Sequence, residues 1–313
     1  MKTALMFSGQ GSQYVGMAKD LYEAHPEVRS MLDAADQQLG YALSALMFEG
    51  PAETLTETRN TQPALFAHEA ALLAVTGIAA TADCVAGHSL GEYSALHAAG
   101  VLSFEDALRL VRLRGELMFA AGQTLPGTMA AVVGLEDDAV RSICEELQDG
   151  ADKVIVAANF NAPGQVVISG SAEHVRACMP VFKERGAKMV KELQVSGAFH
   201  SPLLETARLP LAEALAATTF NDARIDVYVN VSAQPLRSGA ALRDAAIAQL
   251  TSAVLWTQTM QNMAANGVAR FVEIGPGKVL QGLVKRTVSD VQIDGIDTAA
   301  DVERYLQTTS GVQ

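Results

Sequence analysis

The run Gly87-His88-Ser89-Leu90-Gly91 constrains the fold of this chain more than any other stretch. It follows the short apolar segment Cys84 to Ala86 and precedes residues that favour a helix. A serine between two glycines at a strand-to-helix junction is typical of a sharp turn that presents the hydroxyl group at the end of a sheet. Glycines permit such a turn because they have no Cβ atom. An ordinary structural turn can have the same five residues, so the motif alone leaves a nucleophilic and a structural Ser89 both open.

Length and composition indicate a folded globular protein. The chain has 313 residues, of which 49% are hydrophobic, 19% charged and 5% aromatic. This length allows one large domain with a smaller one inserted. No apolar run is as long as a membrane span, and the N-terminal residues lack the long apolar region of a signal peptide. We therefore predict a cytoplasmic protein that binds no membrane. The net charge of −12 argues against a nucleic-acid partner.

Cysteine and histidine spacing gives no sign of a metal site. An odd number of widely separated cysteines predicts free thiols in a reducing compartment. No cysteine has a second cysteine or a histidine at metal-ligand spacing, and no His-Glu-x-x-His pattern occurs. We therefore expect no metal. The three cysteines are Cys84, Cys144 and Cys178.

Two glycine-rich segments match nucleotide-binding patterns only in part. Gly9 and Gly11 fit the start of a dinucleotide fingerprint, but Tyr14 stands where the third glycine belongs. Gly277-Lys278 is followed by Val279 and not by the serine or threonine of a P-loop. We therefore expect no nucleotide cofactor.

Strand-like and helix-like runs alternate along the chain, which is typical of the α/β class. Between about residues 125 and 194 their order is β-α-β-β-α-β, the order of a ferredoxin-like unit. We therefore predict a ferredoxin-like small domain at 125–194. It is inserted into a larger domain, made of 1–124 and 195–313, with a central and mostly parallel sheet.

Helix boundaries in the large domain follow from capping residues. Asn60 is expected to cap a long apolar helix that ends at Gly77. Ser103 is expected to cap the helix in which Asp106 occupies the third position. The residues after about Asp301 are expected to form a peripheral tail.

Two further residues carry possible chemistry. Arg114 lies in the middle of the apolar face of the helix that Ser103 caps, where an unpaired guanidinium group is costly. Either structural acceptors satisfy it, or it binds a carboxylate in a pocket, for which its planar fork is suited. His200 lies in a loop bounded by glycine, serine and proline, 111 residues after Ser89. It is either a structural histidine or a base in the late position found in hydrolase-like folds.

Seven blocks of sequence, in the same order, resemble the malonyl-CoA:acyl-carrier-protein transacylases, which include the acyltransferases of polyketide synthases. The resemblance covers nearly the whole chain. It implies an α/β-hydrolase-like large domain, a ferredoxin-like small domain and an active site in the cleft between them. The blocks are Gly9 to Gln13, Thr61 to Ala64, Gly87 to Ser94, Arg114-Gly115, Asn161 to Gln165, Gly197 to His200, and Glu273 to Lys278.

This resemblance implies a ping-pong acyl transfer. Ser89, with His200 as general base, takes the malonyl group from malonyl-CoA and passes it to the phosphopantetheine thiol of an acyl carrier protein. The backbone carbonyl of Gln249 corresponds to the group that orients the histidine. The backbone amides of Gln10 and Leu90 correspond to the oxyanion hole.

The acyl pocket follows from the same resemblance. Arg114 corresponds to the residue that pairs with the malonyl carboxylate, which gives its position in an apolar face a function. Phe199 is of the residue type that excludes branched acyl groups, so we expect malonyl to be preferred over methylmalonyl. No cofactor is implied, because malonyl-CoA is a substrate. A monomer with a transiently bound carrier protein is the simplest expectation.

One departure and three alternatives remain open. Ser8 stands where the family usually has proline, so the loop is less restricted and the position of the Gln10 amide is fixed less firmly by the backbone. A hydrolase that removes stalled acyl groups from carrier proteins would use the same Ser89 and His200, although Arg114 argues against neutral acyl chains. A non-catalytic docking module for carrier proteins is a second alternative. Fatty-acid synthesis and loading of a polyketide synthase in trans require the same residues.

Overall fold

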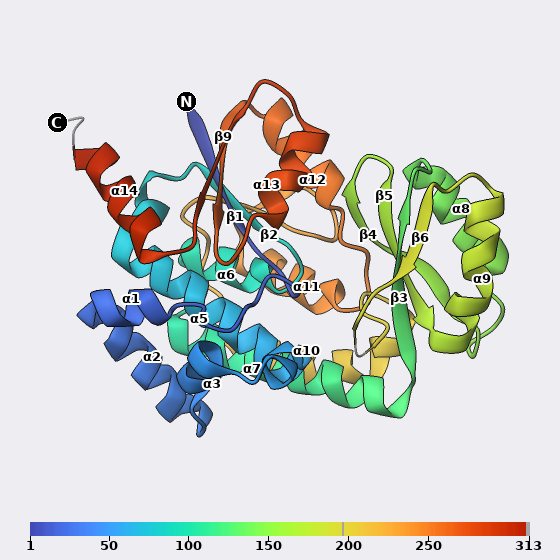
Figure 1. Ribbon diagram of the computed structural model, residues 1–313, viewed down its shortest axis with the longest axis horizontal. Coiled ribbons are helices and arrows are strands. Elements are labelled where there is room, and N and C mark those ends of the chain that lie inside the picture. The colour runs from blue at the N-terminus through green and yellow to red at the C-terminus, as the bar shows by residue number, and fades with distance from the viewer. Residues whose placement is uncertain (196, 311–313) are drawn as a thin grey trace.

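The computed structural model describes residues 1–195 and 197–310, and contains two sheets (Figure 1). The larger sheet has six strands in the order β10-β9-β1-β2-β7-β8. All neighbouring strands are parallel except β7 and β8, so the predicted mostly parallel central sheet is confirmed. The strands are β1 (Lys2–Phe7), β2 (Cys84–Gly87), β7 (Asp226–Tyr228), β8 (Pro235–Leu236), β9 (Val268–Ile274) and β10 (Gln292–Ile296).

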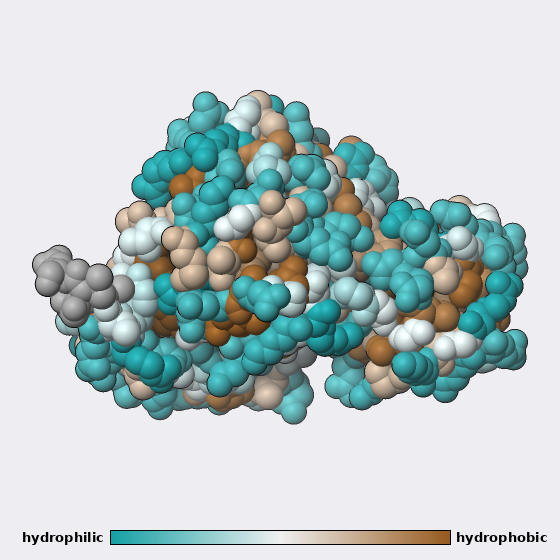
Figure 2. Space-filling view, turned by 90° about the horizontal axis from the view of Figure 1, so that it is seen from above, coloured by the Kyte–Doolittle hydropathy of each residue, from teal (hydrophilic) through white to brown (hydrophobic). Residues whose placement is uncertain are grey.

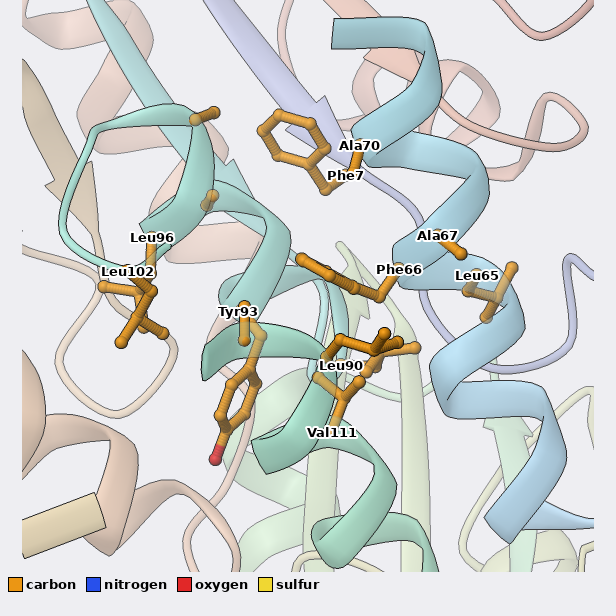
Figure 3. Close-up of a cluster of buried hydrophobic side chains, with 14 of the residues drawn as sticks. Phe7, Leu65, Phe66, Ala67, Ala70, Leu90, Tyr93, Leu96, Leu102 and Val111 are labelled. Atoms are coloured by element: carbon orange, nitrogen blue, oxygen red, sulfur yellow. The ribbon is translucent and has the colours of Figure 1, made fainter. Parts of the chain in front are cut away.

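Strand β1 is buried on both faces, as in a sheet covered by helices on either side. Leu5 and Phe7 belong to the core on one face, and Ala4 and Met6 to the core on the other. Figure 3 shows Phe7, Phe66 and Leu90 gathered between β1 and the helices of the first face. The helices of that core include α5 (Thr58–Thr76), α6 (Gly91–Ala98) and α7 (Phe104–Thr124). The opposite core contains α12 (Trp256–Ala265) and α13 (Val279–Thr287).

The smaller sheet has four antiparallel strands in the order β4-β5-β3-β6, which is the predicted ferredoxin-like arrangement. One face packs on two helices, around Phe160 and Phe182. On the other face, Met129 and Val167 belong to the main core of the large domain. The elements are β3 (Gly127–Val133), α8 (Asp137–Leu147), β4 (Ile155–Ala162), β5 (Gln165–Ser171), α9 (Ala172–Glu184) and β6 (Met189–Glu192). The domain boundaries at 124/125 and 194/195 stay a prediction.

Capping was predicted correctly for one helix and wrongly for another. The Ser103 hydroxyl accepts a hydrogen bond from the Asp106 amide at 3.0 Å, as expected. Helix α5 begins at Thr58, before Asn60, because the extended backbone of Glu57 already provides the N-cap position. The Asn60 side chain instead donates to the carbonyl of Thr54 at 2.9 Å.

The prediction of a peripheral tail is also wrong. Helix α14 (Ala299–Ser310) packs on the large domain, and Val302 is fully buried in its core. The Ala299 amide donates to Asp20 Oδ2 at 2.7 Å, which joins α14 to α1. The remaining helices are α1 (Lys19–Ala24), α2 (Pro26–Leu39), α3 (Leu43–Glu49), α4 (Ala52–Thr56), α10 (Glu205–Ala216) and α11 (Gly239–Gln249), with short 3-10 helices at Ile78–Thr81 and Pro202–Leu204.

The surface divides into a larger and a smaller lobe with an indentation between them (Figure 2). Hydrophilic residues cover most of this face, with hydrophobic ones scattered among them. No helix in the described part of the chain is long and apolar enough to cross a membrane. Cys84, Cys144 and Cys178 are buried and free, which confirms the predicted free thiols.

Gly115 sets the distance between α5 and α7. A Cβ atom at this position would lie 2.8 Å from the Thr58 carbonyl oxygen and 2.9 Å from the Arg59 Cα atom. Because these are backbone atoms, Gly115→Ala must move one helix away from the other. We expect it to lower the free energy of unfolding by about 1–3 kcal/mol, measured by urea unfolding.

Gly282→Ala in α13 is the matched control, since no atom lies within 4 Å of the added Cβ. It should be neutral or stabilise the fold by up to about 1 kcal/mol. Equal effects of the two substitutions would show that helix packing does not depend on Gly115.

Candidate active site

Polar residues gather at the carboxyl ends of three adjacent strands of the large sheet, β1, β2 and β7. The loop Ser8 to Gln10 follows β1, Ser89 follows β2, and Asn230 lies just after β7. In open parallel sheets, ligands bind at this edge. The fold therefore brings together segments that are far apart in the sequence.

Ser89 occupies a sharp turn between β2 and α6. Its φ angle is +53°, in the left-handed region that serine rarely adopts. A Cβ atom at Gly87 would lie 1.8 Å from the carbonyl carbon of Gly91, and one at Gly91 would lie 2.3 Å from the Phe7 carbonyl oxygen. Both flanking glycines are therefore required by close backbone contacts, and the turn is the one that the motif predicts.

Asn230 clamps this turn from the neighbouring strand. Its Oδ1 atom accepts a hydrogen bond from the Ser89 amide at 2.7 Å, and its Nδ2 donates to the Gly87 carbonyl at 2.7 Å. Its own amide donates to Glu92 Oε2 at 2.6 Å. Sequence reasoning missed Asn230, because a single asparagine 141 positions after Ser89 has no local pattern.

His200 lies against Ser89. The distance between Ser89 Oγ and His200 Nε2 is 2.7 Å. His200 Nδ1 lies 3.0 Å from the Gln249 carbonyl and 3.1 Å from the Ser252 carbonyl. Two carbonyl acceptors require the proton on Nδ1, so Nε2 is free to accept the hydroxyl proton of Ser89. The carbonyl of Ser252 was not anticipated from the sequence.

Burial keeps the imidazole neutral. His200 is 4% exposed, and burial together with the nearby Arg114 charge lowers its pKa to about 3. The hydrogen bonds to the two carbonyls oppose this shift but do not reverse it. A neutral imidazole next to a hydroxyl group can act as a general base at neutral pH.

Arg114 reaches the same point from α7, and it is fully buried there. Its Nη2 atom donates to Ser89 Oγ and to Gln249 Oε1, both at 3.0 Å, and Nη1 donates to Gln62 Oε1 at 2.9 Å. Within the described residues, Arg114 forms no salt bridge and its Nε has no acceptor, although the charge of the buried Glu92 carboxyl acts on it. A buried cation without an anionic partner is costly, so this arrangement favours an incoming anion.

Gln249 connects the two halves of this arrangement. Its side chain accepts from Arg114, while its Nε2 donates to the Ser89 carbonyl at 2.8 Å. Its main-chain carbonyl faces His200. One residue thus contacts the serine, the histidine and the arginine, and it is itself fully buried.

The two predicted amide donors lie on either side of the turn. Leu90 directly precedes α6, where amides point out of the helix and lack internal acceptors. Gly9 packs so closely that a Cβ would lie 2.6 Å from the His88 carbonyl oxygen, which brings the next residue, Gln10, to the turn. In the described structure, neither the Leu90 nor the Gln10 amide donates to another protein group.

Phe199 precedes His200 and its ring is buried in the main core.

A cavity of about 340 Å³ opens beside Gln10, between the large domain and the segment that returns from the small one. Ser89, His200 and Arg114 are not among its lining residues. The cavity is lined by Gln10, Glu53, Thr56, Glu57, Phe119, Gln194 and Val195.

In the described residues, no group of three histidine, cysteine or acidic side chains is arranged to hold a metal ion. The expectation that the protein uses no cofactor stays a prediction. The chemistry available at the site is that of a serine nucleophile, a neutral imidazole, amide donors and a buried cation.

Comparison with known proteins agrees with this geometry. The family model described as "Acyl transferase domain" matches residues 5–310. A malonyl CoA-acyl carrier protein transacylase of Bacillus subtilis is 44% identical over 98% of this chain and 97% of its own length. The corresponding protein of Haemophilus influenzae is 43% identical over 97% of this chain and 99% of its own.

Solved structures agree over the full length. An acyl carrier protein S-malonyltransferase from Vibrio cholerae superposes with a TM-score of 0.92, at 42% identity, and covers 97% of this chain and 99% of that one. A malonyl-transacylase in complex with its holo type II polyketide synthase acyl-carrier protein has a TM-score of 0.93 at 39% identity, covering 98% and 100%. The chain therefore belongs to the acyl transferase family, among the malonyl CoA-acyl carrier protein transacylases.

Proposed function

We propose that this protein transfers the malonyl group of malonyl-CoA to the phosphopantetheine thiol of an acyl carrier protein, through a malonyl-Ser89 intermediate. The observation that carries the proposal is the buried Arg114 guanidinium, 3.0 Å from Ser89 Oγ and without a carboxylate partner in the described structure. A malonyl group carries a free carboxylate, which a two-donor fork binds with charge-assisted hydrogen bonds. The relatives named malonyl CoA-acyl carrier protein transacylases support malonyl as the acyl group, and one relative's complex supports the carrier protein as acceptor.

In the first half-reaction, Ser89 Oγ attacks the thioester carbonyl while His200 Nε2 takes the hydroxyl proton. The amides of Leu90 and Gln10 are placed to stabilise the oxygen that becomes negative. When the C–S bond breaks, His200 returns the proton to the thiolate of coenzyme A. The Nδ1 proton stays on the ring, held by the carbonyls of Gln249 and Ser252.

In the second half-reaction, the thiol of the carrier protein attacks the malonyl ester. His200 removes the thiol proton and passes it to Ser89 Oγ as the ester bond breaks. The product is the malonyl thioester of the carrier protein, and the free enzyme is restored. Because no proton or electron is left over, these residues suffice without a cofactor.

Selectivity and pathway follow as finer parts of the proposal. Phe199, buried next to His200, is proposed to crowd the methyl branch of methylmalonyl. We place the enzyme in fatty-acid synthesis in the cytoplasm, acting as a monomer. Loading a polyketide synthase in trans is the alternative, and comparing transfer rates to carrier proteins of the two pathways separates them.

The first test is the mass of the intact protein after brief exposure to malonyl-CoA, methylmalonyl-CoA or acetyl-CoA without carrier protein. We expect a malonyl adduct that persists in buffer, disappears on addition of holo carrier protein, and does not form in Ser89→Ala. Methylmalonyl-CoA should label more slowly because of Phe199. Rapid return to the unmodified mass in buffer would favour the hydrolase, and absence of any adduct would favour the docking module.

Arg114→Ala tests the carboxylate clamp. We expect malonyl transfer to fall by a factor on the order of 10² or more, since a charged bidentate pair is lost. Acetyl transfer should be unchanged or faster, because acetyl has no carboxylate. Arg114→Lys keeps the charge but loses the two-donor fork, so its malonyl transfer rate should lie between those of the wild type and Arg114→Ala. An equal loss for both substrates would mean that Arg114 is structural.

The low pKa of His200, about 3, predicts an unusual pH profile. The base is neutral in the free enzyme above that value, so kcat/KM should stay nearly flat between about pH 5 and pH 7. For a histidine at its ordinary pKa, kcat/KM would fall about 25-fold from pH 7 to pH 5. Acylation at low malonyl-CoA concentration, with circular dichroism as the folding control, measures this. A tenfold fall with intact folding contradicts the depressed pKa.

A further inference from the structure

Ser8 and Glu69 form a buried pair that the reaction described above does not use. Both residues are fully buried, and the Ser8 hydroxyl donates to Glu69 Oε1 at 2.7 Å. Ser8 opens the loop after β1, and Glu69 lies in α5, 61 residues later. No sequence pattern connects them.

The pair lies at the contact between the loop and the nucleophile turn. A Cβ atom at Gly91 would lie 2.8 Å from the Ser8 carbonyl oxygen. A Cβ at Gly275, in the turn after β9, would lie 2.7 Å from Glu69 Oε1 and 2.8 Å from Ser8 Oγ. Two glycines thus make room for the pair, and Ser8 is enclosed between α5, α6 and the β9 turn.

The surroundings of Glu69 fit a neutral carboxylic acid. In the described residues, Glu69 has no ion-pair partner, and its buried Oε2 accepts no hydrogen bond. The charged group that bears on it most is another buried carboxyl, that of Glu273 in β9. Burial, with a smaller contribution from Glu273, raises the pKa of Glu69 to about 8, against the opposing effect of the neighbouring polar groups of Ser94 and Ser8.

Helix α5 also holds the other end of the loop. Thr58 Oγ1 accepts a hydrogen bond from Gln10 Nε2 at 3.1 Å. Thr58 precedes Glu69 by about three helical turns, so both lie on the same face of α5. This face therefore contacts the residues on both sides of Gly9, which itself packs on the His88 carbonyl.

We propose that the Ser8–Glu69 hydrogen bond fixes the loop Ser8 to Gln10 against the Ser89 turn, with Glu69 as a positioning residue that acts in its neutral form. The inference rests on the proposed function, because it concerns the Gln10 amide as an oxyanion donor. The Glu69 side chain and helix α5 restrain the loop, as a proline ring at position 8 would do by restricting φ.

Pre-steady-state acylation of Ser89 by malonyl-CoA tests the proposal. Ser8→Ala and Glu69→Ala should lower the maximal acylation rate about tenfold, as for a displaced donor whose complete loss costs about 10²–10³. The malonyl-CoA concentration at half-maximal rate should change less than about twofold, since Arg114 is untouched. Glu69→Gln, which resembles the neutral acid, should restore the rate to within about twofold of the wild type.

Ser169→Ala is the matched control. Ser169 is a fully buried serine in β5, and its hydroxyl has no partner in the described structure. Losing it removes the same atom without breaking a hydrogen bond. Its acylation rate should equal that of the wild type.

A stability measurement tests the neutral form independently of activity. A raised pKa means that the folded state keeps a proton that the unfolded state loses above its ordinary value. The stabilising effect of that proton is lost as pH rises from about 4.5 to about 8. Glu69→Gln cannot titrate, so its Tm should rise relative to wild type over this range and level off above it. Glu92 titrates in both proteins and cancels in the difference, whereas Glu273 interacts with Glu69 and its smaller contribution is part of the measured difference.

The outcomes separate this inference from the proposed function. Absence of a malonyl adduct in the wild type would overturn the proposed function. An adduct in the wild type, with folded Ser8→Ala and Glu69→Ala acylating at the wild-type rate, would overturn only the positioning role. A Glu69→Gln variant as slow as Glu69→Ala, or a Tm difference independent of pH, would show that Glu69 does not act as a neutral acceptor.

Discussion

The left-handed backbone of Ser89 is the constraint on which the rest of the site depends. A serine keeps a φ of +53° only where its surroundings fix it from several sides. Here the amide is held by Asn230, the carbonyl by Gln249, and the following glycine lies against the end of β1. Each of these contacts comes from a different part of the large domain. The turn is therefore stabilised by tertiary structure, and the short motif only makes it sterically possible.

In the part of the chain that the structure describes, main-chain carbonyls and not a carboxylate orient His200, and this is linked to the presence of Arg114. Both Arg114 Nη2 and His200 Nε2 contact the same hydroxyl oxygen, that of Ser89. A carboxylate placed to orient the histidine would also attract the guanidinium, and would compete with the carboxylate of an acyl group. Main-chain carbonyls fix the imidazole tautomer without adding a negative charge. The buried cation remains available for an anion, and its charge adds to the effect of burial, which lowers the pKa of His200.

The sequence predicted those features that local physics determines. The alternation of predicted strands and helices indicated both sheets, because hydrophobic periodicity and turn residues are local properties of the sequence. The glycines around Ser89 predicted the turn, and Ser103 predicted the start of α7. The prediction that Asn60 caps α5 was wrong because Glu57, three residues earlier, has the extended backbone of an N-cap. The prediction of a peripheral tail was wrong because Val302 is buried against the large domain. Its burial depends on which surface the chain returns to, and no local pattern encodes that.

Residues that hold the reactive groups were the least predictable part, and the opening loop shows why. Read alone, Ser8 weakens the restraint on the loop, because serine does not limit φ as proline does. In the folded protein a carboxyl group from α5 replaces that restraint, 61 residues away in sequence. Neither residue predicts this contact by itself, because the sequence shows Glu69 only as a carboxyl group that is costly to bury in an apolar helix. Only their contact turns two local irregularities into one consistent structure, and such pairs become visible only when the fold is known.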